Sequence, residues 1–261
     1  MTSTPVDEGP GHGPYSGQDV GSAFAVLQCF GPDRPALTTA AVAHRTGLER
    51  GTARRLLRTL ADLGYVRHDG ETFRLTPRTL DLGYAYLSGL ALPEIAHPHL
   101  HDLAHELNET ASLSVLDRGD VVYLTVVPGH RHAPPTLTVG ARRPAHLSSA
   151  GHVLLAALPG DELDRQLAAL PGPAALSAEI GQVRERGWAM VDRDRDGGLR
   201  AIAAPVRHRR DRVVAAVTAS VHPDRLGPGL VERDYVPELL RTAWSIEADA
   251  AKSPDPGISR S

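Results

Sequence analysis

The sequence predicts an α+β protein in two parts, a small helical domain with a β-hairpin and a larger domain with an antiparallel sheet flanked by helices. Three observations predict it. Apolar residues recur at helical spacing between Ser22 and Leu63. An Asp-Gly pair at 69–70 then separates two short alternating segments, as in a two-residue hairpin. After Ser112, strand and helix patterns mix without βαβ regularity, which favours an antiparallel sheet.

The composition fits a folded protein of two domains. The chain has 261 residues, of which 41% are hydrophobic, so a sizeable core can form. Its one cysteine, Cys29, excludes a disulfide framework and a cysteine metal cage. No run of 18 apolar residues occurs, and the start of the chain lacks a basic stretch followed by an apolar one. We therefore expect a cytoplasmic protein without a membrane segment.

The formal net charge of −3 hides an asymmetry. Residues 21–80 hold nine arginines against five carboxylates, a balance of +4, whereas residues 1–20 carry −3 and residues 81–261 carry −4. A basic small domain attached to a more acidic one is expected of a DNA-binding protein with a separate sensing or assembly domain.

The N-terminal region begins with a predicted tail. Residues 1–19 are rich in Gly, Pro, Ser and Thr, and we expect them to be disordered. The first helix is predicted from Ser22, because Ala23, Val26, Leu27 and Phe30 share one face, and it ends at Gly31-Pro32.

The stretch from Thr38 to Leu63 predicts a helix-turn-helix. Thr38 is suited to cap a helix that runs to Thr46, and Gly47 suits the left-handed residue after its end. The second helix carries leucines on one face. Its opposite face carries Gly51, Arg54, Arg55 and Arg58. We expect this cationic face to enter the major groove of double-stranded DNA, the alternative being a surface helix with solvated arginines.

Strands at Tyr65–His68 and Thr72–Leu75 flank the Asp69-Gly70 turn and form a predicted wing, which completes a winged helix-turn-helix domain over residues 20–76. The wing either approaches the DNA backbone or only covers the small core through Phe73 and Leu75. The predicted DNA-contacting residues are Thr38, Arg50, Gly51, Thr52, Arg54, Arg55, Arg58, Arg67 and Arg74.

A linker helix is predicted over residues 77–91. Thr76 provides a capping hydroxyl and Pro77 occupies the first helical position, while Leu80, Tyr84 and Leu87 share one face. Pro93 and Pro98 are expected to interrupt the chain after this helix. A helix over 99–108 is then expected to open the second domain, residues 92–251.

The second domain is predicted to alternate strands and helices. A hairpin is expected from ASLSVL and VVYLTVV, and a third strand from TLTVG at 136–140. The expected helices are one opening on Ser148 and Ser149, then DELDRQLAAL, SAEIGQVRERG and residues 231–249. WAMVD, LRAIAAPV and VVAAVTASV are expected strands, and residues 252–261 a loose tail.

Catalytic and metal-binding patterns are weak in this domain. His97, His101 and His105 are four residues apart, but no HExxH frame or cysteine supports a metal, so we expect exposed histidines. Ser149 lies near His152 without a GxSxG elbow or an orienting acid. No phosphate-binding or dinucleotide fingerprint follows a strand. We therefore predict no enzyme, no metal and no cofactor.

A binding pocket for an organic acid is the better prediction. The start of the Ser148 helix offers backbone N–H groups, the positive end of a helix dipole and two serine hydroxyls. Arg200 is a candidate partner for an acid, or alternatively for a surface carboxylate. Thr218 and Ser220 alternate on a strand and share one face, which lines a cavity or faces solvent.

The sequence resembles IclR-type bacterial transcriptional regulators from about Ser22 to Ala250. The similar segments include TTAAVAHRTGLERGTARRLLRTLADLGYV, VGARRPAHLSSAGHVLLA and GLRAIAAPVRHRRDRVVAAVTAS. The resemblance implies a GAF-like effector domain that binds a small organic acid, and a homodimer or dimer of dimers on a palindromic operator. The expected effector-binding residues are Leu137, Val139, Ser148, Ser149, Ala150, Asp192, Arg200, Ala201, Thr218 and Ser220.

A narrower resemblance concerns the branch that regulates aromatic-acid catabolism through the β-ketoadipate pathway. LTPRTLDLGYAYLSGLALPEIAHPHL and VDRDRDGGLRAIAAPV carry it. Two positions depart from the family. Gly51 stands where alanine is more usual, at a cost of about 1 kcal/mol in helix propensity, and Ser149 stands where some members have glycine.

The prediction is therefore a ligand-responsive DNA-binding regulator of aromatic-acid catabolism, its operator binding shifted by an acid held in the second domain. One alternative is a regulator of the same type in another pathway, such as acetate, sugar-acid or antibiotic metabolism. The other is a small-molecule enzyme whose helix-turn-helix serves protein contacts.

Overall fold

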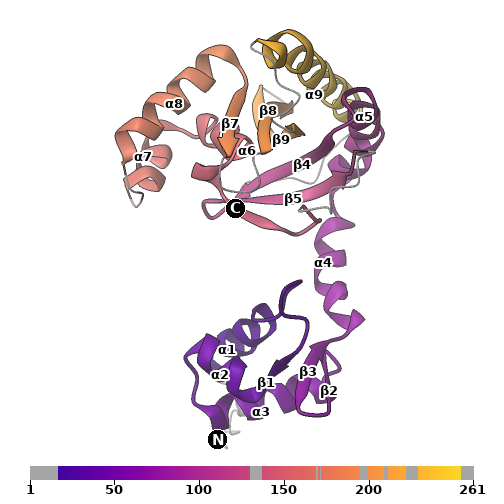
Figure 1. Cartoon of the computed structure of the whole chain (residues 1–261), viewed down its shortest axis with the longest axis vertical. Helices are drawn as coiled ribbons and strands as arrows, with labels where there is room; N and C mark the ends of the chain where they lie inside the picture. Colours follow the sequence, from indigo (N-terminus) through magenta and orange to yellow (C-terminus); the bar gives the residue numbers. More distant parts are fainter. Residues whose placement is uncertain are drawn as a thin grey trace, which may run out of the picture. The chain divides into compact units, whose positions relative to one another are not determined.

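The computed structural model describes residues 17–129, 137–168, 170, 172–193, 199–208, 211–221 and 229–253, without the side chains of 17, 18, 192, 193, 199 and 221. The chain divides into two compact units, residues 1–86 and 87–261 (Figure 1).

The first unit is a winged helix-turn-helix. Its elements are α1 (Gly17–Gln28), β1 (Leu37–Thr38), α2 (Thr39–Thr46), α3 (Arg50–Asp62), β2 (Val66–Asp69) and β3 (Thr72–Leu75). The strands form a small antiparallel sheet in the order β1-β3-β2. Val26 of α1, Val42 of α2 and Leu57 of α3 are fully buried and meet at the centre of its core. The predicted hairpin is confirmed, but Asp69 pairs with Thr72, so its two-residue turn is Gly70-Glu71 and not Asp69-Gly70. Gly70 has a positive φ of 63°, which a tight hairpin turn requires.

The helix α1 begins at Gly17, five residues before the predicted start at Ser22. The prediction placed Asp19 in a disordered tail, and this is wrong. Asp19 lies in the first turn of α1, where a carboxylate interacts favourably with the helix dipole, and it also forms an ion pair with α3. The rest of the predicted tail, residues 1–16, lies outside the described residues.

The predicted linker helix over 77–91 is shorter than expected. A 3₁₀ turn at Pro77–Thr79 leads into α4 (Leu80–Leu87), with proline at the start as predicted. Thr76 does not cap this helix with its side chain, since its hydroxyl donates to the carbonyl of Gly64. The hydroxyl thus ties the linker to the end of α3.

The expected interruption at Pro93 and Pro98 is also wrong, because α5 runs unbroken from Ala91 to Leu107. Pro93 lies in the first turn, where the missing N–H costs nothing. Pro98 removes a hydrogen bond inside the helix. One face nevertheless stays buried through Leu92, Ala96, Leu100, Leu103 and Ala104. This burial outweighs the cost of the proline.

The second unit is built on a six-stranded antiparallel sheet with the order β6-β5-β4-β9-β8-β7. The strands are β4 (Thr110–Asp117), β5 (Asp120–Val127), β6 (Arg142–Pro144), β7 (Ala189–Arg193), β8 (Leu199–His208) and β9 (Arg212–Val221). The helices α5 and α9 (Val236–Ala250) cover one face. The other face carries α6 (Ser149–Ala156), with α7 (Gly160–Ala168) and α8 (Pro173–Arg186) packed beside it.

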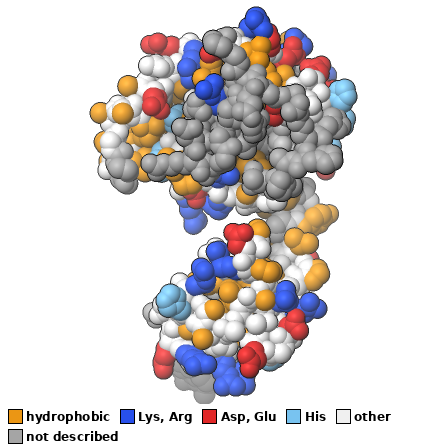
Figure 2. Space-filling view, viewed as in Figure 1, with side chains coloured by type: hydrophobic (Ala, Val, Ile, Leu, Met, Phe, Trp, Pro, Cys, Tyr) orange, Lys and Arg blue, Asp and Glu red, His pale blue; other side chains and the backbone are white. Residues whose placement is uncertain are grey.

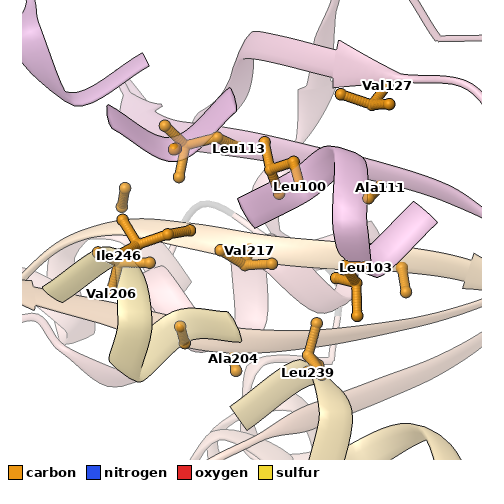
Figure 3. Packing of buried hydrophobic residues seen from close by; sticks show 14 of the residues in the cluster. Leu100, Leu103, Ala111, Leu113, Val127, Ala204, Val206, Val217, Leu239 and Ile246 are labelled. Atoms are coloured by element: carbon orange, nitrogen blue, oxygen red, sulfur yellow. The ribbon is translucent and has the colours of Figure 1, made fainter. Parts of the chain in front are cut away.

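Alternation along each strand divides the core into two layers. Val206, Val217 and Leu113 point toward α5 and α9, where Figure 3 shows them facing Leu103, Leu239 and Ile246. Ala203 and Ala216 point to the α6 layer. Small residues at these strand positions let α6 lie close to the sheet, and Gly151 of α6 lies so close to the backbone of Ala145 that no Cβ fits there.

The third predicted strand, TLTVG at 136–140, is wrong. Thr136 lies outside the described residues, and residues 137–140 belong to no strand, with a turn at 139–140. The strand that extends the sheet is β6. Arg142 fixes β6 by bonding to Asp117 (2.8 Å) and Asp120 (3.2 Å) at the turn between β4 and β5. Burial opposes the charge on Arg142, but the hydrogen bonds that it donates to Asp117 and Asp120 outweigh this effect and raise the pKa of the guanidinium. The anchored strand leads directly to the start of α6.

Candidate functional site

The turn between α2 and α3 is built from local signals. Thr38 caps α2 by accepting a hydrogen bond from the Ala41 N–H at 3.2 Å, and Gly47 ends the helix with a φ of 68°. The predicted cap is therefore confirmed, and the Thr38 hydroxyl is engaged by the protein itself. Leu48 packs against the core of the unit, and α3 follows two residues later.

The two faces of α3 differ as the sequence predicts. Ala53, Leu56, Leu57 and Leu60 are buried. Gly51, Arg54, Arg55 and Arg58 are exposed, and Thr52 is half-buried between the two faces. Gly51 has open space beside it, so only conformational entropy distinguishes glycine from alanine there. Basic side chains accordingly gather on the surface of the first unit (Figure 2).

A groove of about 880 Å³ lies between α3, the start of α2 and the wing. Arg50, Arg54 and Arg58 line it from α3, and Thr38 lines it from the end of β1, just before α2. His68 and Gly70 contribute from the wing, and two carboxylates, Asp62 and Glu71, lie at its border. The groove thus gathers four of the nine predicted DNA-contacting residues on a single concave surface.

The remaining arginines have different surroundings. Arg55 forms an ion pair with Asp19 at 3.2 Å, and Arg74 forms one with Asp69 at 3.1 Å. Arg67 lies opposite Arg74 in the register of the wing. Among the residues that the structure describes, no carboxylate pairs with Arg50, Arg54 or Arg58. The three arginines in the groove, and Arg67 on the wing, are therefore available for an anionic partner.

The start of α6 forms the second candidate site. Ser148 caps this helix, its Oγ accepting a hydrogen bond from the Gly151 N–H at 3.0 Å. Ser149 and Ala150 follow in the first turn and are both buried. The Ser149 Oγ is buried and has no hydrogen-bond partner within the described part of the chain. The two serines therefore differ, since one is used by the helix and the other is available.

The sheet beneath α6 presents hydroxyls and small side chains. Thr218 lies between Ser112 and Ala203 in the register, and Ser220 pairs with Ala201. Directly paired residues share a face of an antiparallel sheet, so these residues all lie on the α6 face with Ala203 and Ala216. The Thr218 Oγ1 is, like that of Ser149, buried without a hydrogen-bond partner among the described residues. A buried hydroxyl without a partner needs an explanation, such as a bound water or ligand.

The structure does not bring all predicted effector residues together. Arg200 is adjacent to Ala201 in β8, so alternation places it on the opposite face from Thr218 and Ser220. Asp192 pairs with Arg200 in the register, and its side chain lies outside the described residues. Leu137 packs beside the α6 layer, whereas half of the Val139 side chain is exposed. Ser112 was not predicted, although the alternation in ASLSVL indicates that Ser112 and Ser114 share a face.

His97, His101 and His105 are exposed, as predicted, whereas two other histidines are used in structural contacts. His152 is buried, and its Nε2 donates to the carbonyl of His146 at 3.0 Å, so it makes no hydrogen bond to Ser149. His99 on α5 pairs with Asp249 on α9 at 2.8 Å. Within the described ranges no group of three His, Cys, Asp or Glu side chains is placed to hold a metal ion. None of the helices described is long and apolar enough to cross a membrane.

The first unit is a winged helix-turn-helix with an arginine-lined groove, as in DNA-binding proteins. The second unit is a sheet domain with buried hydroxyls that have no hydrogen-bond partner among the described residues. Together they indicate a DNA-binding regulator that carries a small-molecule domain. The chain belongs to the IclR family of bacterial transcriptional regulators. Residues 21–70 match the IclR helix-turn-helix domain, and residues 84–248 match the C-terminal domain of the bacterial transcriptional regulator IclR. Membership makes the chain a ligand-responsive transcriptional regulator rather than an enzyme.

Two relatives illustrate the similarity in sequence. The Pca regulon regulatory protein of Pseudomonas putida is 37% identical over 234 residues, which cover 85% of this chain and 80% of that protein. The p-hydroxybenzoate hydroxylase transcriptional activator of Acinetobacter baylyi is 33% identical over 235 residues, covering 84% and 87%.

Solved structures agree with the fold. A transcriptional regulator from Rhodococcus sp. RHA1 has a TM-score of 0.78 at 42% identity, covering 90% of this chain and 98% of that one. An IclR homologue from Microbacterium hydrocarbonoxydans, complexed with 4-hydroxybenzoate, has a TM-score of 0.73 at 26% identity, covering 90% and 100%.

The two serines at the start of α6 give a test of this geometry. Ser148→Ala removes the cap of α6, so we expect the free energy of unfolding to fall by about 1 kcal/mol. Ser149→Ala removes a buried hydroxyl without a partner, so we expect stability without ligand to be unchanged or higher. Urea denaturation of the purified variants measures both values. A larger loss for Ser149→Ala than for Ser148→Ala would contradict the assignment.

Proposed function

We propose that this regulator controls the catabolism of aromatic acids of the β-ketoadipate pathway, and that an aromatic acid bound at the α6 face of the sheet shifts its operator binding. The observation that carries the proposal is the pair of buried hydroxyls, Ser149 Oγ and Thr218 Oγ1, for which the described residues offer no hydrogen-bond partner. The printed functions of the relatives support the ligand class, because they name the Pca regulon and p-hydroxybenzoate hydroxylase.

The chemistry of this face suits an aromatic acid. The first-turn N–H groups of α6 have no acceptor within the helix and lie at its positive end, which favours a carboxylate. Ser149 and Thr218 provide hydroxyls for the carboxylate or a ring hydroxyl. Ala201 and Ala203 place small side chains on the same face of the sheet. Arg200 is not part of this proposal, because it lies on the other face of the sheet.

We propose that α3 enters the major groove of a palindromic operator, with Arg50, Arg54 and Arg58 toward the DNA. These side chains share one groove, and none of them forms an ion pair with a described carboxylate, although Asp62 and Glu71 line the same groove. Gly51 allows a close approach of the helix backbone, and Thr52 lies at the edge of the same face. Arg67 and Arg74 of the wing are proposed to contact the sugar-phosphate backbone.

A palindromic operator implies two copies of the first unit, and one surface suits a second copy. An apolar cavity of about 370 Å³ lies between α1, α3 and α4. Its lining includes Val20, Phe24, Leu63 and Leu82, each about half-exposed. Leu80 and Tyr84 on α4 are more exposed still. Such contiguous apolar surface marks an interface, and we propose that it pairs the DNA-binding units of a homodimer.

Removing an arginine from the groove tests the DNA assignment. We expect Arg58→Ala to weaken operator binding about 5- to 150-fold if it reads a base, or to reduce the salt slope by about 0.9 if it contacts a phosphate. Fluorescence anisotropy against salt concentration measures both. The matched control is Arg78→Ala, which removes the same charge from a residue stacked on Tyr65 outside the groove. Equal losses for the two variants would refute the assignment.

The effector is tested by thermal unfolding of the full chain with a panel of acids. A ligand that binds only the folded state at 100 times its Kd adds about 2.7 kcal/mol to stability, so 4-hydroxybenzoate or protocatechuate should raise Tm clearly. We expect Ser149→Trp to abolish this rise by filling the site, and Ala251→Trp, on an exposed position, to retain it. The proposal fails if only sugar acids or short aliphatic acids raise Tm, or if Ser149→Trp responds like the wild type.

A further inference from the structure

Asp19 and Arg55 form an ion pair between two helices of the DNA-binding unit. The Asp19 Oδ1 lies 3.2 Å from Nη2 of Arg55, and the two residues are 36 positions apart in the sequence. The side chain of Asp19 is 21% exposed and that of Arg55 is 57% exposed. The carboxylate is thus the more buried partner, and it holds an arginine whose other end faces solvent.

Arg55 differs in this respect from the other arginines of α3. Arg50, Arg54 and Arg58 line the groove toward the wing, whereas Arg55 lies on the side of α3 that meets α1. Among the described residues, it is the one α3 arginine with a carboxylate partner from another helix. The contact engages one of the five guanidinium N–H donors, and the fork remains able to bind a second group.

The partner carboxylate affects what Arg55 can bind. A carboxylate beside the guanidinium repels a nearby phosphate and cancels part of the attraction on which backbone contacts depend. The major-groove edge of guanine presents two neutral acceptors, N7 and O6, which an arginine fork contacts in a bidentate manner. An arginine held in place by a carboxylate has already lost part of its rotamer freedom, so less entropy is lost on binding.

We infer that Asp19 is a positioning residue for sequence recognition. It holds Arg55 so that the outer edge of the guanidinium reads a guanine in the operator, which makes Arg55 the arginine of α3 with the strongest base discrimination. This inference rests on the proposed binding of α3 in the major groove and adds a base-reading pair to it. Asp19 itself does not touch the DNA.

A double-mutant cycle on the full-length protein tests the inference. The operator is a duplex selected from a random pool by the wild type, and its affinity is compared with that of duplexes carrying each single base-pair change. Arg55→Ala should remove about 5- to 150-fold of discrimination at one base pair. Asp19→Ala should remove at least about threefold at that same base pair, and the double variant should match Arg55→Ala because the two residues act as a unit.

Two further variants separate geometry from charge. The amide oxygen of Asp19→Asn still accepts a hydrogen bond from Arg55, so this variant should keep more discrimination than Asp19→Ala. Asp62→Asn removes the same charge from the exposed face of α3 and should strengthen binding to all duplexes equally. Thermal unfolding shows whether each variant is folded. If Asp19→Ala does not fold, Asp19→Asn is used in its place to test the inference.

Several outcomes overturn the inference. If Asp19→Ala strengthens binding to all duplexes equally, as expected for Asp62→Asn, then Asp19 contributes charge alone. The same conclusion follows if Asp19→Ala changes the affinities equally with and without Arg55. A uniform loss of affinity and a smaller salt slope in Arg55→Ala would make Arg55 a phosphate contact. Failure of the DNA-binding proposal is distinguishable, because the wild type would then select no duplex from the pool.

Discussion

The buried face of α3 is the constraint on which the DNA-binding unit depends. Leu56, Leu57 and Leu60 fill the space between α1, α2 and the wing, and each buried leucine contributes about 1.5–3 kcal/mol relative to an exposed one. Because these side chains fix the rotation of α3 about its axis, they also determine which residues face outward. The direction of the arginines is therefore a consequence of core packing.

The same rotation sorts the arginines into two groups. One side of the exposed face lines the groove toward the wing. The other side meets α1, where Arg55 forms an ion pair with Asp19. A change of one position in the buried pattern would turn α3 by about 100° and remove both arrangements. Electrostatics refines the DNA-binding surface, but the hydrophobic core places it.

In the second unit the corresponding constraint is the alternation of side chains across the sheet. It sends large apolar residues toward α5 and α9, and small or hydroxyl-bearing residues toward α6. The close approach of Gly151 to Ala145 sets the position of α6. Together they bury the hydroxyls of Ser149 and Thr218 without a hydrogen-bond partner in the described part of the chain, at a cost that a bound ligand can offset.

Features encoded within a few residues were predictable from the sequence. The Thr38 cap, the hairpin after α3 and the leucine face of α3 depend on local chemistry, and each is confirmed, although the hairpin turn lies one residue later than predicted. Features that depend on distant partners were not. The helix through Pro98 is held by burial, Asp19 is ordered in a helix that packs on α3, and the face occupied by Arg200 follows from strand register. Strand alternation in ASLSVL does indicate Ser112, a signal that the prediction did not use.

The proposed function requires that an acid bound at the α6 face and an operator bound at α3 change each other's affinity. The most direct test is calorimetric titration of the effector acid into the full-length protein, with and without saturating operator duplex. We expect the operator to change the Kd of the acid by about 5- to 150-fold, and the acid to change the Kd of the operator by the same factor. If the Kd of the acid is the same with and without the operator, the two sites are not coupled and the proposed function is contradicted.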